Sequence, residues 1–266
     1  MGNAYDNVLA ARSKDRLTGL DFVNGLFTGF IELHGDRRFA DDPAVVGGVA
    51  YLGDTPVTVL ATEKGRDTKS RIKRNFGTPN PEGYRKALRL AKQAEKFGRP
   101  VICFIDTPGA FCGVDAEKRG QGEAIARNLL EFMRLKTPVI SVVLGEGGSG
   151  GALALGVCDV LGVLENSLYS VISPRGFASI LWKDASKEKD ACGIMKIAAE
   201  NMLELGVAEK VIDEPPGGAH NNVEHTAENI AEFLLKSLNK KMQISIDVLL
   251  KERYTKFRKI GEFIEE

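Results

Sequence analysis

Residues 139–156 read VISVVLGEGGSGGALALG, and this stretch decides the fold. Its first half is apolar and rich in β-branched residues, which is typical of a buried strand. Five glycines and a serine interrupt the apolar run, and small residues at helical spacing follow. The pattern predicts a strand, a tight turn and the start of a helix. Glycine permits close approach of a ligand, and the first amides of a helix lack partners within it. Gly150 and Gly151 are therefore predicted to direct N–H groups at an oxyanion.

This turn differs from the loops that bind nucleotides. No lysine followed by serine or threonine closes the glycines, as a P-loop requires. From the glycines alone two interpretations stay open, an anion-binding turn and a turn whose glycines serve only close packing.

The composition indicates a chain with ample core. Of the 266 residues, 43% are hydrophobic and 27% are charged, which suits one large α/β domain or two small ones. Basic and acidic residues number 36 each, so the general basic excess typical of nucleic-acid binding is missing. No apolar run is long enough for a membrane span, and no signal peptide is visible. We expect a cytoplasmic protein that binds neither membrane nor nucleic acid.

The cysteines and histidines carry no metal signature. The four cysteines form no CxxC pair, and we expect them to be small buried hydrophobes. The three histidines show no HExxH or similar spacing. The sequence therefore predicts no metal in this chain.

The chain repeats the order of strand, glycine turn and helix. Because helices separate successive strands after the first hairpin, these strands are predicted to be parallel. The predicted elements are a hairpin over 45–51 and 56–61, helices over 79–97, 117–135 and 190–205, and strands over 101–105, 160–164, 168–172 and 207–212.

The two ends of the chain have helical apolar spacing. The N-terminal part to about residue 35 predicts a helical lead-in, and the charged C-terminal part predicts either a docking arm or a cap on the chain's own core. We assign a single domain over 1–266, with a helical lead-in at 1–44, a core at 45–220 and a helical arm at 221–266.

Residues 63–77 concentrate cations in an otherwise neutral chain. Such a cluster suits a phosphate group or an acidic partner protein. A charged segment is also typical of a solvated surface, so this alternative stays open.

Several blocks, in order along the chain, carry a resemblance to a known family. They are ELHGDR at 32–37, KGR at 64–66, RNFG at 74–77, PEGYRKA at 81–87, IDTPGA at 105–110 and the glycine turn at 145–151. From about residue 20 to residue 231 the chain resembles the alpha subunits of the carboxyltransferase component of bacterial acetyl-coenzyme A carboxylase. The resemblance implies a crotonase-like α/β fold, a spiral of repeated strand-strand-helix units with helical arms at both ends.

The resemblance also implies a reaction. In this family, carboxybiotin on a biotin carboxyl carrier protein, made by biotin carboxylase, gives its carboxyl group to acetyl-CoA. The product is malonyl-CoA, in the first committed step of fatty-acid synthesis. Such chemistry needs two oxyanions stabilised, and biotin itself can accept the methyl proton. This agrees with the lack of an evident nucleophile and base in the sequence.

The resemblance assigns functions to individual residues and partners. Gly150 and Gly151 match the pair whose amides hold the ureido oxygen of biotin. The acetyl-CoA oxyanion hole and a zinc ribbon belong to a beta subunit, so this chain alone is expected to be inactive and to assemble as two alpha with two beta subunits. The further candidate substrate-binding residues are Gly109, Ala110, Gly147, Gly148, Arg66, Lys69 and Arg74.

Two stretches depart from the pattern of the family. Phe111-Cys112-Gly113 stands where relatives often have Tyr-Pro-Gly, and Arg175 stands where they often have glutamate. Arg175 reverses the charge beside a turn that faces either the partner or the pocket, so the contacts there stay open.

Two other classes of function remain as alternatives. A stand-alone acyl-CoA hydratase or isomerase of the same fold would use Glu146, and a serine peptidase would pair Ser149 with His220 or His225. A non-catalytic scaffold subunit would only bind its partners.

Overall fold

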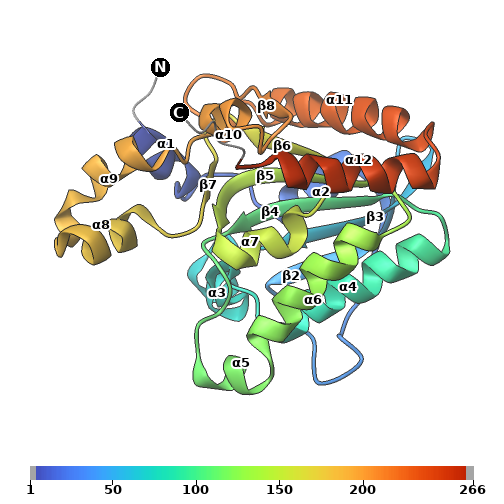
Figure 1. Cartoon of the computed structure of the whole chain (residues 1–266), viewed down its shortest axis with the longest axis horizontal. Coiled ribbons are helices and arrows are strands. Elements are labelled where there is room, and N and C mark those ends of the chain that lie inside the picture. Colours follow the sequence, from blue (N-terminus) through green and yellow to red (C-terminus); the bar gives the residue numbers. More distant parts are fainter. Residues whose placement is uncertain (1–3, 262–266) are drawn as a thin grey trace.

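A mixed sheet forms the centre of the protein, whose computed structural model describes residues 4–261 (Figure 1). The strands are β1 (Thr28–Glu32), β2 (Val45–Leu52), β3 (Thr55–Thr62), β4 (Val101–Thr107), β5 (Val139–Gly148), β6 (Val160–Leu164), β7 (Leu168–Ser170) and β8 (Lys210–Ile212). Their order is β1-β2-β3-β4-β5-β6-β8, and β7 pairs with the end of β5. The β2-β3 hairpin and the parallel pairing from β3 onward confirm the predictions.

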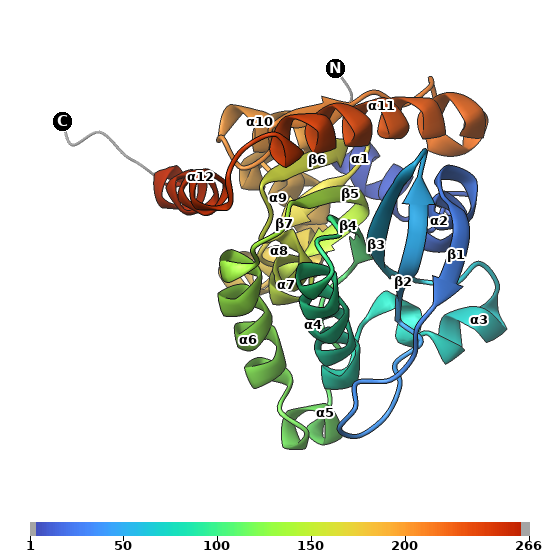
Figure 2. The ribbon, with the colours of Figure 1, turned by 90° about the vertical axis from the view of Figure 1, so that its right-hand side faces the viewer.

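Helices cover both faces of the sheet. They are α1 (Ala4–Ala11), α2 (Gly19–Leu26), α3 (Thr68–Lys73), α4 (Pro81–Lys96), α5 (Val114–Lys118), α6 (Gln121–Arg134), α7 (Ser149–Gly156), α8 (Pro174–Trp182), α9 (Glu188–Met195), α10 (Ala199–Glu204), α11 (Val223–Met242) and α12 (Ile246–Lys259). Figure 2 shows α4 and α6 side by side on one flank of the sheet. In Figure 1, α8 and α9 extend from the sheet beside α1.

Strand β4 shows how the sequence builds two apolar layers. Side chains alternate along a strand, so Val101, Cys103 and Ile105 join the cluster beneath α4, α6 and α7. Ile102 and Phe104 join the cluster beneath α2 and α11 on the other face. All seven residues of β4 are buried, as expected for a strand covered on both sides.

The N-terminal lead-in is not entirely helical, which corrects the prediction. After α2 the chain becomes extended at Phe27, and Gly29 takes a left-handed backbone. Residues 28–32 then form β1, which adds to the hairpin at the edge of the sheet. The apolar spacing across this segment is compatible with a helix, and only pairing with β2 selects the strand.

Two predicted helices are each broken in two. Gly120, with φ of 84°, separates α5 from α6, and Lys196, with φ of 50°, follows α9 before α10 begins. Short 3₁₀ turns stand at Asn75–Gly77, Ala185–Lys187 and Ala219–Asn221.

The C-terminal helices cap the chain's own core. Ile230, Leu234 and Leu238 of α11 are buried in the second apolar cluster. Arg253 of α12 is fully buried, and its guanidinium binds both carboxylate oxygens of Asp159 at 2.9 and 2.7 Å. Of the two interpretations left open, the cap therefore applies to the described helices.

The cysteines only partly match the expectation. Cys103, Cys158 and Cys192 are buried, but Cys112 is exposed, because it follows β4 in the loop before α5 rather than in a strand. Across the described residues, 4–261, no helix combines the length and the apolar character needed to cross a membrane.

Candidate functional site

The glycine turn has the predicted order of strand, tight turn and helix. β5 ends at Gly148, and Ser149 turns the chain sharply into α7 with φ of 50°. Gly148 has no side chain with which to cap the helix. The first N–H groups of α7, which include those of Gly150 and Gly151, therefore lack acceptors within the helix.

The turn after β4 packs directly against this glycine turn. A Cβ atom on Gly148 would lie 2.2 Å from the carbonyl oxygen of Pro108, and one on Gly151 would lie 2.6 Å from the amide nitrogen of Ala110. Gly109 takes φ of 146°, which favours glycine. The structure thus brings Gly109 and Ala110 against the two glycines of the turn, where the sequence analysis expected a second wall.

Gly150 differs from its neighbours. A Cβ atom there would meet only Ile125, at 3.5 Å, which is ordinary van der Waals contact. Packing against the protein therefore does not require glycine at this position.

A small cavity of about 50 Å³ lies beside the turn. Its lining includes Gly147, Gly148 and Ser149, together with Pro174 at the start of α8. Arg175 is exposed in the first turn of α8 and does not line this cavity.

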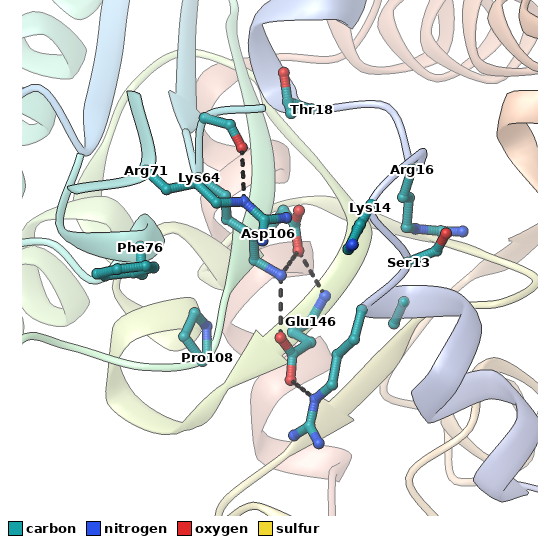
Figure 3. Close-up of a pocket in the computed structure, with 13 residues that line it drawn as sticks. Ser13, Lys14, Arg16, Thr18, Lys64, Arg71, Phe76, Asp106, Pro108 and Glu146 are labelled. Carbon is teal, nitrogen blue, oxygen red and sulfur yellow. Dashed lines mark hydrogen bonds and ion pairs between the residues drawn. The ribbon is translucent and has the colours of Figure 1, made fainter. Parts of the chain in front are cut away.

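A buried charge cluster stands next to the glycine turn (Figure 3). The Nζ atom of Lys64 lies 2.7 Å from Asp106 Oδ1 and 3.0 Å from Glu146 Oε2. The other oxygen of Glu146 accepts a hydrogen bond from Arg12 Nε at 2.8 Å. Lys64, Asp106 and Glu146 come from the carboxyl ends of the neighbouring strands β3, β4 and β5.

The pKa shifts of Lys64, Glu146 and Arg12 all favour their charged forms. Burial would lower the pKa of Lys64, but the carboxylates of Asp106 and Glu146 outweigh burial and raise it. Burial would likewise raise the pKa of Glu146, but Lys64 and Arg12 outweigh it and lower this pKa. Glu146 is thus an ionised, fully paired carboxylate.

A second cavity, of about 250 Å³, opens over the charge cluster. Its cationic lining residues are Arg12, Lys14, Arg16, Lys64 and Arg71, and its acidic ones are Asp106 and Glu146. Phe76, with φ of 54° and an exposed ring, forms part of its rim. The excess of cations makes this cavity suitable for an anionic group.

The structure does not bring the other predicted cations to this cavity. Arg66 pairs with Asp21 of α2, and Arg74 donates to the carbonyl oxygen of Pro43 at 2.7 Å. Lys69 is exposed on α3. Arg71, another cation of the basic segment that the sequence analysis considered for anion binding, does line the cavity. Lys64 also lines it, and the signal that identifies Lys64 is its position just after β3, at the carboxyl edge of the parallel strands.

Neither alternative enzyme class gains support from the side chains. Both oxygens of Glu146 are occupied, so it is not placed as a free acid or base. Among the described residues no hydrogen bond joins Ser149 to a histidine, and the ring of His225 contacts Asn229 instead. A search of residues 4–261 finds no cluster of three or more His, Cys, Asp or Glu side chains placed to hold a metal ion.

Comparisons with known proteins identify the family of the chain. A family model described as acetyl co-enzyme A carboxylase carboxyltransferase-like matches residues 3–261. The acetyl-coenzyme A carboxylase carboxyl transferase subunit alpha of Clostridium botulinum (strain Eklund 17B / Type B) is 58% identical over 98% of this chain and 95% of the relative. A longer relative from Natranaerobius thermophilus is named acetyl-coenzyme A carboxylase carboxyl transferase subunits beta/alpha. It is 56% identical, and the match covers 98% of this chain and 43% of the relative.

Solved structures show the same fold at low sequence identity. Transcarboxylase 12S superimposes with a TM-score of 0.68 at 18% identity, over 90% of this chain and 45% of that chain. This chain thus spans about half the length of that relative. A Pseudomonas malonate decarboxylase hetero-tetramer in complex with coenzyme A gives a TM-score of 0.65 at 19% identity, over 81% and 86% of the two chains. These likenesses confirm the predicted crotonase-like α/β fold.

Proposed function

The chain belongs to the family of acetyl co-enzyme A carboxylase carboxyltransferases, and on that basis we propose that it supplies the half of the active site that receives biotin. It is a transferase of carboxyl groups. The carboxyl group passes from carboxybiotin on the biotin carboxyl carrier protein to acetyl-CoA, and the malonyl-CoA formed enters fatty-acid synthesis.

The N-terminal end of α7 carries this proposal. Carboxybiotin supplies the carboxyl group, and its departure leaves negative charge on the ureido oxygen. The uncapped amides of Gly150 and Gly151 are suited to donate hydrogen bonds to such an oxygen, and the space at Gly150 permits its approach. Gly109 and Ala110 would hold the turn from the other side, and Gly147 and Gly148 would border the ligand.

The cation-rich cavity has a separate function in this proposal. Lys14 and Arg71, which the carboxylates of the charge cluster do not bind, would attract an anionic group of the substrate or of the carrier protein. Arg66, Lys69 and Arg74 would act at longer range, since none of them lines the cavity.

The partner of the chain is a beta subunit, as the names of the relatives indicate. We propose an assembly of two alpha and two beta subunits, in which the beta subunit bears the zinc ribbon and the acetyl-CoA oxyanion hole. Biotin carboxylase and the carrier protein complete the system. We also propose that residues 4–261 form one domain, since helices α2 and α11 from opposite ends of the chain pack on the same sheet face. The outermost residues of the predicted range, 1–3 and 262–266, lie outside the described part of the chain.

The test is the substitution Gly150→Val in the assembly with the beta subunit. The valine side chain would occupy the space beside the amide, and loss of one oxyanion donor typically lowers the rate about 10²–10³-fold. The matched control is Gly122→Val on α6, where an added Cβ meets nothing within 4 Å.

We expect Gly150→Val to lower malonyl-CoA formation about 10²–10³-fold while beta-subunit binding stays intact, and the control to behave as the unaltered protein. Unchanged transfer by Gly150→Val would show that the turn does not bind the reacting group, and would favour the scaffold function.

A further inference from the structure

Residues 12–18 form a strap that joins α1 to α2 and passes over the ends of the central strands. Five of the residues that line the cavity of about 250 Å³ belong to this strap: Arg12, Ser13, Lys14, Arg16 and Thr18. Figure 3 labels the last four. We propose that the strap positions the glycine turn for carboxyl transfer, through Arg12 and Arg16. The inference rests on the proposed function of Gly150 and Gly151.

Arg12 fixes the side chain of Glu146. Its Nε atom lies 2.8 Å from one carboxylate oxygen of Glu146, whose other oxygen is bound by Lys64 at 3.0 Å. The Nη1 atom of Arg12 also reaches Glu188 of α9, at 3.2 Å. A residue inside the glycine turn is therefore held between the strap and the end of β3.

Arg16 fixes the backbone of β5 two residues earlier. Its Nε atom donates to the carbonyl oxygen of Leu144 at 2.8 Å. The same guanidinium is anchored by the buried carboxylate of Glu214, at 2.6 and 3.1 Å. The strap thus binds β5 on both sides of Gly145, at Leu144 through Arg16 and at Glu146 through Arg12.

Asp106 closes the opposite side of the same segment. Its carboxylate accepts a hydrogen bond from the amide of Glu146 at 2.8 Å, and a Cβ atom on Gly145 would lie 2.4 Å from it. Residues 144–146 consequently have little freedom to move. Only three residues separate Glu146 from Gly150, so a displacement of the first alters the direction of the amides in the second.

The magnitudes favour positioning over stabilisation for Arg12. Its side chain is 39% exposed, and partly exposed ion pairs of this kind contribute little to the stability of the fold. Catalytic geometry is far more sensitive, because a misplacement of about 1 Å can lower a rate about 10²-fold. The loss of Arg12 is therefore expected to affect the reaction much more than the fold.

The experiment compares Arg12→Met, Arg12→Lys and the control Arg127→Met in the assembly with the beta subunit. Arg127 forms an ion pair with Glu123 on the surface of α6, away from the turn. For Arg12→Met we expect kcat to fall about 10- to 100-fold, with KM values and unfolding midpoint nearly unchanged. Arg12→Lys should recover part of kcat, because lysine retains the charge but cannot bind both glutamates, and Arg127→Met should retain full kcat.

Amide hydrogen exchange distinguishes a positioning function of Arg12 from a contribution to overall stability. The amides of residues 147–151 should exchange faster in Arg12→Met while those of the sheet stay protected. An unchanged kcat, or a fall in kcat matched by a general loss of stability, would overturn the inference.

The results of the two substitutions distinguish a failure of this inference from a failure of the proposed function. If Gly150→Val lowers transfer and Arg12→Met does not alter it, the strap has no positioning function and the proposed function stands. If Gly150→Val leaves transfer intact, both proposals are wrong.

Discussion

The two glycines that open α7 are not equivalent. A side chain on Gly151 would overlap the backbone of Gly109 and Ala110, whereas one on Gly150 would meet only Ile125. The sequence predicts both as one anion-binding pair. A glycine in the sequence does not distinguish close packing from approach of a ligand, because both need the absence of Cβ. The distances show that packing requires glycine at position 151 but not at position 150.

Two adjacent aspartates before β2 have pKa values shifted in opposite directions. Burial is the largest influence on both. At Asp41 hydrogen bonds from Lys86 and the Gly35 amide outweigh burial and lower the pKa to about 2. At Asp42 burial outweighs the amides of Ala44 and Asn80 and raises the pKa to about 6.

The raised pKa of Asp42 predicts that the free energy of unfolding decreases as the pH rises. Its pKa is higher in the folded protein than in the unfolded chain, so the folded state binds the proton more tightly. Its contribution to the free energy of unfolding is complete below about pH 4 and is lost as the pH rises through about 6. Denaturant unfolding between pH 4 and pH 7 should therefore show a steeper decline for the unaltered protein than for Asp42→Asn.

The quantity to compare is the slope of the free energy of unfolding against pH, because Asp42→Asn also loses hydrogen bonds that asparagine cannot reproduce. Asp42 accepts from two amides, at 2.9 Å from Ala44 and 2.6 Å from Asn80, so the absolute stability of the variant will also change. Equal slopes for the two proteins would contradict the raised pKa.

At the scale of elements, one side chain anchors α12. Besides Asp159, Arg253 donates to the carbonyl oxygens of Phe132 and Leu135 at 2.8 Å and of Thr137 at 3.0 Å. These carbonyls belong to the end of α6 and the segment before β5. The helix is thereby fixed to the elements that lead into the glycine turn.

Removal of this anchor should be costly. Arg253→Met would leave Asp159 buried and unpaired, and breaking a buried pair in this way costs about 3–5 kcal/mol. Denaturant unfolding measures the loss, and Arg253→Met combined with Asp159→Asn should recover part of it. Lys256→Met on the same helix breaks a more exposed pair with Glu209 and should cost less than about 1 kcal/mol. A similar small cost for Arg253→Met would mean that packing alone holds α12.

The elements also show what periodicity can and cannot predict. The hairpin, the parallel strands and helix α4 follow directly from apolar spacing and turn residues. The break between α5 and α6 does not, because apolar spacing continues across Gly120 and the left-handed φ of 84° is decided by how the two helices pack. The site divides in the same way: the turn is visible in the sequence, but Arg12 and Asp106 join it only through the fold.

At the scale of the whole molecule, the chain supplies a site that needs a partner. The first amides of α7 lack acceptors within the helix, and the carboxylates of Glu146 and Asp106 beside the turn are bound by Lys64, so neither is placed as a free acid or base. The names of the relatives, alpha in some and beta/alpha in others, indicate where the rest lies.

Carboxyl transfer by this chain should therefore require the addition of a beta subunit. We expect no malonyl-CoA from acetyl-CoA and carboxybiotin with this chain alone, and steady formation once a beta subunit is added. Product formed by the chain alone would show that both oxyanion sites lie in one polypeptide. No product in either case would reopen the hydratase and scaffold functions.

The distribution of the thiols has a practical consequence. Burial raises the pKa of Cys103, Cys158 and Cys192, which makes these thiols slow to react. Cys112 is exposed two residues after Ala110, in the loop that continues from the second wall of the site. A maleimide dye should therefore attach at one position without any engineering, and its fluorescence would report the docking of a partner or carrier on this side of the protein.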